Sequence, residues 1–495
     1  MEKFTLSDAD DVFPGAGLDT SGDDSITALG GNDQVDAGAG NDNVYGGLGE
    51  DTLFGGLGDD WLEGGAALGM DQLYGGAGND VLRGEVCYGG QGDDSLGTEF
   101  NSTSEGGLLY GGDGNDLLYH FVGRDTIWAG NGDDTVRARF DTALPDFDSI
   151  LHGEAGTDVL SFDVYRGFGQ VLVTDFSLTV SGDAWTLTLN GDGVGVVDGF
   201  EAQLGAIYAG NVTLQGSDGD DRIYIEASTG DLAMGGGNDT LTFESIGHFQ
   251  IDGGDGADLI EFNLGHRASL FVLDARQAMT TVSVAGVPAS TIEGVETWHI
   301  GGSHHNDLIY LSDGNDIVTE PIHQSGSDTF YGGAGDDTLD GGRYKDFVSG
   351  DAGRDKLFGG ADDDTITGGL GRDYLAAGSG RDVLVFNSLA DSGTAYGQGV
   401  IDNVTYFQID ATQGSGLYID RIDLSAIDAM AGVAGDQAFS FIGTAEFSAE
   451  GQVRVVQSGT ATFLQVNAVG STGSDMTVCL LAVTAAAIGV EDFIL

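Results

Sequence analysis

Aspartates recur every nine residues in two parts of this chain, and that period limits the fold more than any other feature of the sequence. A fixed short period predicts a solenoid in which each repeat is a unit that cannot bury its apolar side chain alone. In the second half the series is Asp307 and Asp316 and then, after a longer step, the exact nine-residue run Asp328, Asp337, Asp346, Asp355, Asp364, Asp373 and Asp382. In the first half, with one slip and longer insertions, it is Asp24, Asp33, Asp42, Asp51, Asp60, Asp71, Asp80, Asp94, Asp116, Asp125 and Asp134.

Each repeat encodes one very short strand and a glycine-rich turn. The pattern is Gly-Gly-x-Gly-x-Asp-x-apolar-x, and the residue two places after the aspartate is apolar, as at Leu339, Val348 and Leu357. One inward apolar side chain between two outward ones is typical of a short strand, and glycine tolerates the positive φ angles of tight turns. We therefore expect an all-β fold in which two repeats close one coil and coils stack as parallel strands.

The charge of the chain calls for a cationic partner. There are 80 Asp and Glu residues against 17 Lys and Arg, a formal net charge of −63, and there are 87 Gly and 4 Pro among 495 residues. A compact body with this charge repels itself unless cations neutralise it. Scattered basic residues do not form the patch that phosphate backbones require, so nucleic acid is excluded as a partner.

Calcium is the metal that these turns suit best. Stacked turns place a carboxylate and several glycine carbonyls at the edge of each coil, and Ca²⁺ accepts such hard oxygen ligands in flexible geometry far better than Mg²⁺ or Zn²⁺ does. We expect roughly ten to twenty Ca²⁺ ions, whose binding is coupled to folding. Four isolated aspartates fit either a metal ligand or an ordinary turn residue: Asp158, Asp221, Asp239 and Asp258.

The repeats resemble the nonapeptides of RTX (repeats-in-toxin) proteins, as in GGAGND at 75–80, GGDGND at 111–116 and GGAGDD at 332–337. The resemblance implies a right-handed parallel β-roll or β-helix in which the sixth-position aspartate supplies a carboxylate to calcium and the turn glycines supply carbonyls. The segments GGRYKD at 341–346 and ADDDT at 361–365 lack some of these glycines and predict weaker sites. The glycines implied as ligands are Gly75, Gly76, Gly78, Gly111, Gly112, Gly114, Gly332, Gly333 and Gly335.

The period divides the chain into four segments. Repeats occupy 1–140 and 301–385, whereas 141–300 holds longer alternating stretches such as Phe176–Val180 and Trp185–Leu189, which predict strands of a wider, irregular part of the same stack. Residues 386–495 carry FNSLADSG, YIDRIDLSAIDA, QAFSFIGTAEFS and a final Asp492–Leu495, which resemble the C-terminal domain of serralysin-type metalloproteases. That resemblance implies a β-rich cap with an uncleaved signal for a bacterial type I secretion apparatus.

Signals for other routes and for catalysis are missing from the sequence. The N-terminus does not resemble a Sec signal peptide, and no stretch of 18 apolar residues predicts a membrane span. None of the 8 histidines begins an HExxH zinc motif, and neither a GxSxG elbow nor a phosphate-binding loop occurs. Cys87 and Cys479 lie in unlike surroundings, and nothing in the sequence favours a disulfide between them.

Three hypotheses for function remain open at this point. The first is a non-enzymatic secreted calcium-binding protein, extracellular or attached to the cell surface, that acts as an adhesin, biofilm or surface-layer component and contacts a glycan or its own copies. The second is a polysaccharide lyase or epimerase whose site lies in 141–300. The third is a secretion and folding module of a former serralysin-type protease.

Overall fold

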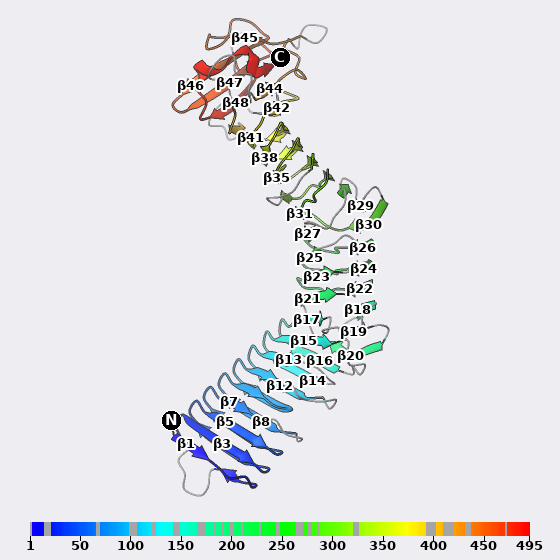
Figure 1. Ribbon diagram of the computed structural model, residues 1–495, viewed down its shortest axis with the longest axis vertical. Coiled ribbons are helices and arrows are strands. Elements are labelled where there is room, and N and C mark those ends of the chain that lie inside the picture. Colours follow the sequence, from blue (N-terminus) through cyan, green and yellow to red (C-terminus); the bar gives the residue numbers. More distant parts are fainter. Residues whose placement is uncertain are drawn as a thin grey trace. The chain divides into compact units, whose positions relative to one another are not determined.

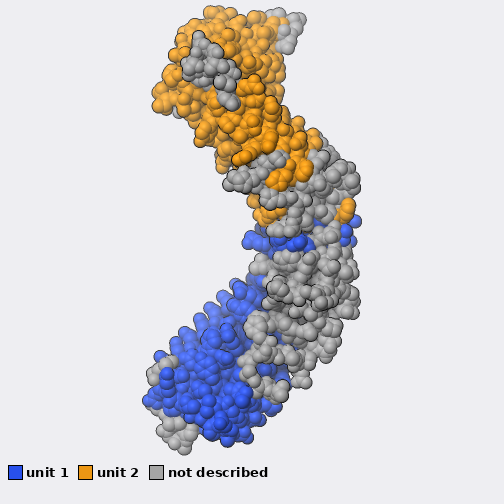
Figure 2. Space-filling model, viewed as in Figure 1, with its two compact units in different colours: residues 1–241, 249–256 blue, residues 242–248, 257–495 orange. Residues whose placement is uncertain are grey.

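The computed structural model describes most of the chain. The described residues are 2–13, 21–65, 70–98, 106–120, 125–141, 149–165, 175–181, 184–189, 192–198, 202–208, 211–226, 229–243, 248–263, 271–274, 279–284, 287–319, 326–392, 402–408, 420–430, 437–470 and 473–495. They form two compact units, unit 1 with residues 1–241 and 249–256, and unit 2 with residues 242–248 and 257–495 (Figure 2).

Unit 1 consists of coils that each contribute one strand to two rows of parallel strands, here called row A and row B (Figure 1). Successive coils lie in register, so that Ile26 pairs with Val44 in row A and Val35 with Leu53 in row B. Row A contains β1 (Glu2–Thr5), β3 (Asp24–Gly30), β5 (Asn43–Leu48), β7 (Trp61–Glu63), β9 (Val81–Arg83), β11 (Ser95–Gly97), β13 (Leu117–His120), β15 (Thr135–Asp141), β17 (Val159–Tyr165), β21 (Ala202–Tyr208) and β23 (Arg222–Glu226). Row B contains β2 (Val12–Phe13), β4 (Gln34–Ala39), β6 (Thr52–Leu57), β8 (Gln72–Ala77), β10 (Val86–Gln91), β12 (Leu108–Asp113), β14 (Thr126–Asn131), β16 (Ser149–Ala155), β22 (Asn211–Gln215) and β24 (Thr229–Ala233).

The core of each coil is the apolar residue two places after the turn aspartate, as the period predicts. Leu53 and Leu62, for example, are both fully buried. The rows face each other across a narrow core filled by these side chains, so no coil is stable without its neighbours. The same position is buried throughout the two arrays, at Ile26, Val35, Val44, Leu73, Leu82, Leu96, Leu118, Ile127, Val136, Leu339, Val348, Leu357, Ile366, Leu375 and Leu384.

An antiparallel insertion interrupts row B in unit 1. Strand β16 pairs in parallel with β20 (Asp192–Asp198), β20 pairs antiparallel with β19 (Ala184–Leu189), β19 pairs antiparallel with β18 (Asp175–Ser181), and β18 returns to a parallel pairing with β22. The expected strands at 176–180 and 185–189 therefore exist, and they form one hairpin. The stack continues through this region with irregular coils, as the alternating stretches predict.

Unit 2 repeats both rows. Row A contains β27 (Leu259–Asn263), β31 (Thr297–Gly301), β33 (Ile317–Thr319), β35 (Thr338–Asp340), β38 (Lys356–Ala361), β41 (Tyr374–Ser379) and β43 (Asn403–Thr405). Row B contains β28 (Phe271–Asp274), β32 (Leu308–Tyr310), β34 (Thr329–Tyr331), β36 (Phe347–Ser349), β39 (Thr365–Thr367), β42 (Val383–Val385) and β44 (Arg421–Asp423). A second antiparallel insertion joins β28 to β29 (Met279–Val284) and β29 to β30 (Val287–Glu293). The remaining strands in this part of the chain are β25 (Thr240–Phe243), β26 (His248–Asp252), β37 (Ala352–Gly353) and β40 (Leu370–Gly371).

The C-terminal segment closes the stack of unit 2. An antiparallel sheet is made by β46 (Gln452–Ser458), β47 (Ala461–Asn467) and β48 (Met476–Leu481), with β45 (Ser440–Phe441) beside β46. Strand β48 pairs in parallel with β43 of row A, and β49 (Phe493–Ile494) pairs with β44 of row B. Two 3₁₀ turns lie at η2 (Ala485–Ala487) and η3 (Val490–Asp492). The coils thus extend beyond residue 385, where the nonapeptides stop.

Two further findings concern the described residues. No helix among them has the length and apolar character needed to cross a membrane. Cys87 in unit 1 and Cys479 in unit 2 are both buried, and they are not joined by a disulfide.

Candidate metal-binding turns

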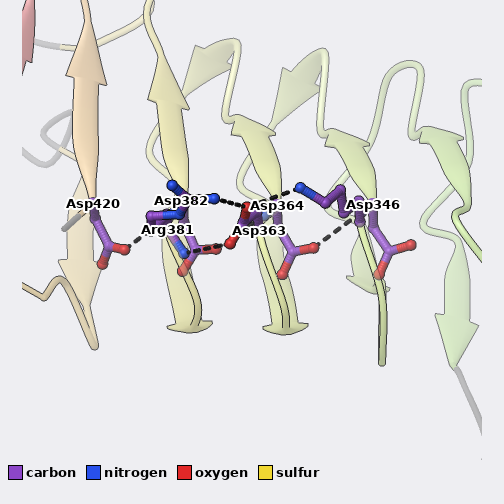
Figure 3. A network of polar contacts seen from close by, with 7 residues as sticks. Asp346, Asp363, Asp364, Arg381, Asp382 and Asp420 are labelled. Atoms are coloured by element: carbon purple, nitrogen blue, oxygen red, sulfur yellow. Dashed lines mark hydrogen bonds and ion pairs between the residues drawn. The ribbon is translucent and has the colours of Figure 1, made fainter. Parts of the chain in front are cut away.

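The turn aspartates form a buried ladder along the stack. The backbone N–H of a turn aspartate donates a hydrogen bond to the Oδ1 atom of the turn aspartate one coil later. Examples are Asp42 to Asp60 at 2.8 Å and Asp346 to Asp364 at 2.9 Å. Figure 3 shows this arrangement for Asp346, Asp364, Asp382 and Asp420 on successive strands. Because Oδ1 satisfies a main-chain donor that the turn leaves without a strand partner, one oxygen of each carboxylate has a structural role.

The second carboxylate oxygen, Oδ2, accepts no hydrogen bond from any described residue at most positions of the ladder. A buried carboxylate oxygen without a donor is costly, and each such atom needs an explanation. The atoms concerned belong to Asp24, Asp33, Asp42, Asp51, Asp60, Asp80, Asp94, Asp116, Asp134, Asp337, Asp346, Asp355, Asp364, Asp373 and Asp402.

Many of these Oδ2 atoms face a main-chain carbonyl from the next coil across a small space. A methyl group built on Gly46 would lie 2.5 Å from Asp51 Oδ2 and 2.5 Å from the carbonyl oxygen of Gly64. The same construction on Gly341 gives 2.9 Å to Asp346 Oδ2 and 2.9 Å to the carbonyl oxygen of Gly359. Glycine is therefore required here because any side chain would fill the space toward which the oxygens converge.

The carboxylates are held at high pKa values. Burial, together with the nearby carboxylates of Asp316 and Asp355, raises the pKa of Asp337 to about 8. The hydrogen bond from the Asp316 N–H acts in the opposite direction and lowers this pKa. Burial likewise raises the pKa of Asp346 to about 9 and of Asp60 to about 7. Without a cation, a row of ionised carboxylates in these turns is therefore unfavourable at neutral pH.

The donor set fits calcium. Each space is bordered by a carboxylate oxygen and main-chain carbonyl oxygens, which are hard ligands for a cation that tolerates irregular geometry. No group of three or more His, Cys, Asp or Glu side chains converges anywhere in the described ranges, so the arrangement differs from zinc or iron centres built on side-chain clusters. Bound calcium supplies positive charge between successive turns, and the chain's own role is to hold the oxygens in line.

The structure places all twenty array aspartates in these turns, with exposed fractions between 0 and 3%. The isolated copies lie in the ladder too, since Asp134 N–H donates to Asp158 Oδ1 at 2.9 Å and Asp221 N–H to Asp239 Oδ1 at 2.8 Å. Asp258 N–H donates instead to a glutamate, Glu296 Oε2, at 2.9 Å. That these aspartates are metal ligands remains a prediction, to which their position lends support.

The predicted glycines occupy three distinct positions. The first glycine of a repeat borders the space beside the carboxylate, and the carbonyl oxygens of Gly75 and Gly111 face Asp60 and Asp94 in this way. The second and fourth glycines have positive φ values, for instance 93° at Gly333 and 122° at Gly335. The remaining predicted glycines follow the same scheme, Gly332 as a first glycine, Gly76 and Gly112 as second and Gly78 and Gly114 as fourth.

The structure adds ladder residues that the nonapeptide pattern missed. Glu85 accepts the N–H of Asp71 at 3.2 Å, and Asp402 and Asp420 accept those of Asp373 and Asp382 at 2.9 Å. All three are followed two places later by a buried apolar residue, at Cys87, Val404 and Ile422. The acidic-x-apolar spacing was therefore present as a signal, but the glycines that identify a turn were absent.

A second ladder runs along the exposed rim with the opposite direction. Here the side chain of the residue before the turn aspartate accepts the N–H of the equivalent residue one coil later, as when Asn41 N–H donates to Asp23 Oδ1 at 3.0 Å. Asp93 N–H donates to Asn79 Oδ1 at 2.9 Å in the same way. The Asn/Asp preference at this position therefore satisfies main-chain donors at the surface.

In unit 2 basic residues enter this exposed ladder. The side chains of Lys345 and Arg381 both pair with Asp363 at 2.8 Å, one from each neighbouring coil, and Figure 3 shows Arg381 beside Asp363. Arg354 pairs with Asp336 in the same way. Arg381 and Lys345 lower the pKa of Asp363 to about 2 through these hydrogen bonds. The rim of unit 2 is thus bridged by ion pairs between coils.

Comparison with known proteins bears on the repeats. The model of the RTX calcium-binding nonapeptide repeat (4 copies) matches residues 18–53, 45–67, 68–96, 110–141, 208–226, 324–348 and 349–384. No curated protein matches the chain. Solved structures with similarity include the AlgE6R2 and AlgE6R3 subunits of the Azotobacter vinelandii mannuronan C5-epimerase. The first is 24% identical with a TM-score of 0.22 over 31% of this chain and 91% of that one, and the second is 25% identical with a TM-score of 0.20 over 36% and 77%.

A further solved structure with similarity is the extracellular lipase LipA from Serratia marcescens, 14% identical with a TM-score of 0.18 over 58% of this chain and 40% of that one. The matched segments cover less than half of the chain. They are RTX calcium-binding nonapeptide repeats, and the all-β parallel stack that they form is consistent with an RTX β-roll.

Proposed function

We propose that this protein is a secreted scaffold, folded by calcium outside a bacterial cell, with a structural or adhesive role at the cell surface or in the extracellular matrix. The observation that carries the proposal is the ladder of buried Oδ2 atoms, which extends over both repeat arrays. A ladder of this length stiffens the stack without forming a reaction centre. Roughly ten to twenty Ca²⁺ ions between successive turns neutralise a large part of the acidic charge.

The C-terminal segment supports the proposal that export precedes folding. In the folded chain Asp492 is 1% exposed and β49 is paired with β44, so the terminal residues that resemble a type I secretion signal are built into the stack. A secretion apparatus reads such a segment before it is buried. Low calcium inside the cell keeps the chain unfolded, and calcium outside then drives folding in this scheme.

The remaining hypotheses stay as alternatives. A lyase or epimerase site in 141–300 would require converging polar side chains, and many side chains of that region lie outside the described residues. Eliminative cleavage or epimerisation of a polysaccharide by the calcium-loaded protein would favour it. A module derived from a serralysin-type protease would be favoured by a partner protein whose export depends on this chain.

Chelation tests the proposed function directly. Calcium removal by EGTA is expected to abolish the β-sheet circular dichroism signal, because the turn carboxylates then repel one another, and millimolar Ca²⁺ is expected to restore it. Mg²⁺ at the same concentration serves as the control and should restore little. Full β-sheet signal in chelator at neutral pH would contradict the proposal.

A further inference from the structure

A surface hollow of about 430 Å³ lies on row A of unit 2, directly beside turns that hold the ladder oxygens. One row of outward-facing residues forms its floor, because Thr338 pairs with Lys356, Lys356 with Tyr374 and Tyr374 with Asn403 on successive strands. Arg354 and Arg372 also line the hollow. Neighbouring strands lie about 4.8 Å apart, so these side chains are presented at regular spacing.

The hollow gathers cations in a chain that has few of them. Seven of the 17 Lys and Arg residues lie between residues 343 and 421. Arg354 pairs with Asp336 at the rim, whereas Lys356 and Arg372 are exposed and form no ion pair with any residue in the described part of the chain. Lys356 contributes, after Arg354, to the lowered pKa of Asp336, but neither Lys356 nor Arg372 is held in an ion pair by a described residue. In a molecule with a net charge of −63, both cations are therefore available to an external anion.

An aromatic ring is held beside these cations. The hydroxyl of Thr405 donates a hydrogen bond to the Tyr374 hydroxyl at 3.0 Å, and the Tyr374 ring lies 5.9 Å from Phe358 at an angle of 54°. These contacts restrict the ring, which is half-buried on the floor of the hollow. A ring fixed in this way offers an apolar surface beside positive charge and the amide of Asn403.

We propose that this hollow binds an acidic saccharide unit. Its carboxylate or sulfate group is held by Lys356 and Arg372, its apolar ring face packs on Tyr374, and its hydroxyls bond to Asn403 and Thr338. The volume lies in the range of about 300–1,000 Å³ that is typical of small-ligand sites. The inference deepens the proposed adhesive function, on which it rests, by naming the class of partner.

Calcium in the adjacent turns is part of the arrangement. Asp337, Asp355 and Asp373 border the hollow, and their carboxylates are nearly fully buried. With cations bound between them, these turns no longer repel an anion, so binding requires the calcium-loaded protein. Neutral saccharides lack the charged group that Lys356 and Arg372 would hold.

Isothermal titration of the calcium-loaded full chain tests the proposal. The ligands are a uronate oligosaccharide, a sulfated oligosaccharide and a neutral one of equal length, and the variants are Arg372→Ala, the pair Lys356→Ala with Arg372→Ala, and Arg343→Ala as a matched control. Arg343 is exposed on the same unit and does not line the hollow. We expect binding of an acidic ligand that weakens at least about tenfold in the double variant and is unchanged in the control.

The pattern of binding separates the outcomes. Binding of the uronate, of the sulfated ligand or of both supports the proposal and identifies the acidic group. Equal binding of the neutral ligand, equal affinity in the double variant, or no binding of either acidic ligand overturns it. Circular dichroism on the same samples keeps the two proposals apart, because calcium-induced folding without saccharide binding overturns this inference alone. Loss of calcium-induced folding overturns the proposed function.

Discussion

The two repeat arrays share one coil geometry but compensate charge differently. In the first array the exposed ladder consists of Asn and Asp side chains, as from Asn79 to Asp93, and in the second array Lys345, Arg354 and Arg381 form ion pairs between coils. Exposed ion pairs are worth about 0–1 kcal/mol each. The ion pairs of the second array therefore contribute little to its free energy of unfolding.

The buried aspartate ladder acts against the second array when calcium is absent. Burial raises the pKa of Asp346 to about 9 and of Asp364 to about 8 in the second array, whereas the pKa values of Asp80 in the first array and Asp373 in the second both lie near 6. The cost of keeping the carboxylates ionised at neutral pH is therefore greatest in a few turns of the second array. The comparison teaches that dependence on calcium follows the buried oxygens, and that rim ion pairs do not remove it.

The largest expected effect is a difference between the arrays when calcium is lowered. We expect β35, β36 and β39, which follow Asp337, Asp346 and Asp364, to lose protection from amide hydrogen exchange at a higher free calcium concentration than β7 and β9, which follow Asp60 and Asp80. The second-array carboxylates have the higher pKa values and are therefore more costly without the cation. Exchange measured by mass spectrometry across a calcium titration reports both arrays in one sample. Earlier loss in the first array would show that the rim cations outweigh burial.

Acidification in chelator is expected to recover β structure. The folded pKa values of Asp337, Asp346 and Asp364 lie near 8, 9 and 8, above their ordinary value of 3.8, so the folded state binds protons more tightly than the unfolded chain. The resulting stability is fully present below about pH 4 and is lost as pH rises through about 6 to 9. Circular dichroism measured in EGTA from about pH 5 to about pH 9 checks whether β structure is lost as pH rises.

The same titration in calcium should show the opposite dependence. Protons compete with Ca²⁺ for the carboxylates, so the calcium concentration needed for folding rises as pH falls. Equal β-sheet signal at all pH values in chelator would contradict the assignment of raised pKa values to the turn aspartates.

Substitution of one ladder residue is expected to have an intermediate effect. Asp355→Asn keeps an oxygen that accepts the N–H of Asp337 but removes the charge and Oδ2, which separates the structural role from the metal role. We expect the calcium midpoint of folding to rise several-fold, equivalent to about 1–3 kcal/mol. Asp362→Asn is the matched control, since Asp362 is exposed and its φ of 81° suits Asn. Equal midpoints for both variants would argue against ligation by Asp355.

The smallest effect is expected at the rim. Arg354→Ala removes the exposed pair with Asp336 and should change the free energy of unfolding in saturating calcium only slightly, because water screens both charges. Thermal unfolding at low and high salt measures it, and the difference from the unsubstituted protein should shrink as salt screens the pair. A larger loss would mean that rim ion pairs do hold the second array together.

The sequence was sufficient for the regular part of the molecule because one short period specifies the strand, the turn and the core together. Leu53 and Leu357 could be placed in the core from their distance to an aspartate alone. The antiparallel pairing of β18 with β19 could not be predicted, since alternation of apolar and polar residues predicts strands but not which strands pair. Glu85 and Asp402 were missed because their turns lack the glycine pattern, although their side chains accept the same main-chain hydrogen bond.

The direction of the buried ladder makes the two ends of a coil stack chemically unlike. The main-chain N–H of a buried turn aspartate is satisfied by a carboxylate of the following coil, as that of Asp373 is by Asp402. Removal of a coil from the C-terminal side therefore leaves a buried amide without its acceptor, whereas the exposed ladder loses an acceptor when a coil is removed from the N-terminal side, as Asn41 would lose Asp23. Each coil is thus completed by its successor at the buried turn and by its predecessor at the rim.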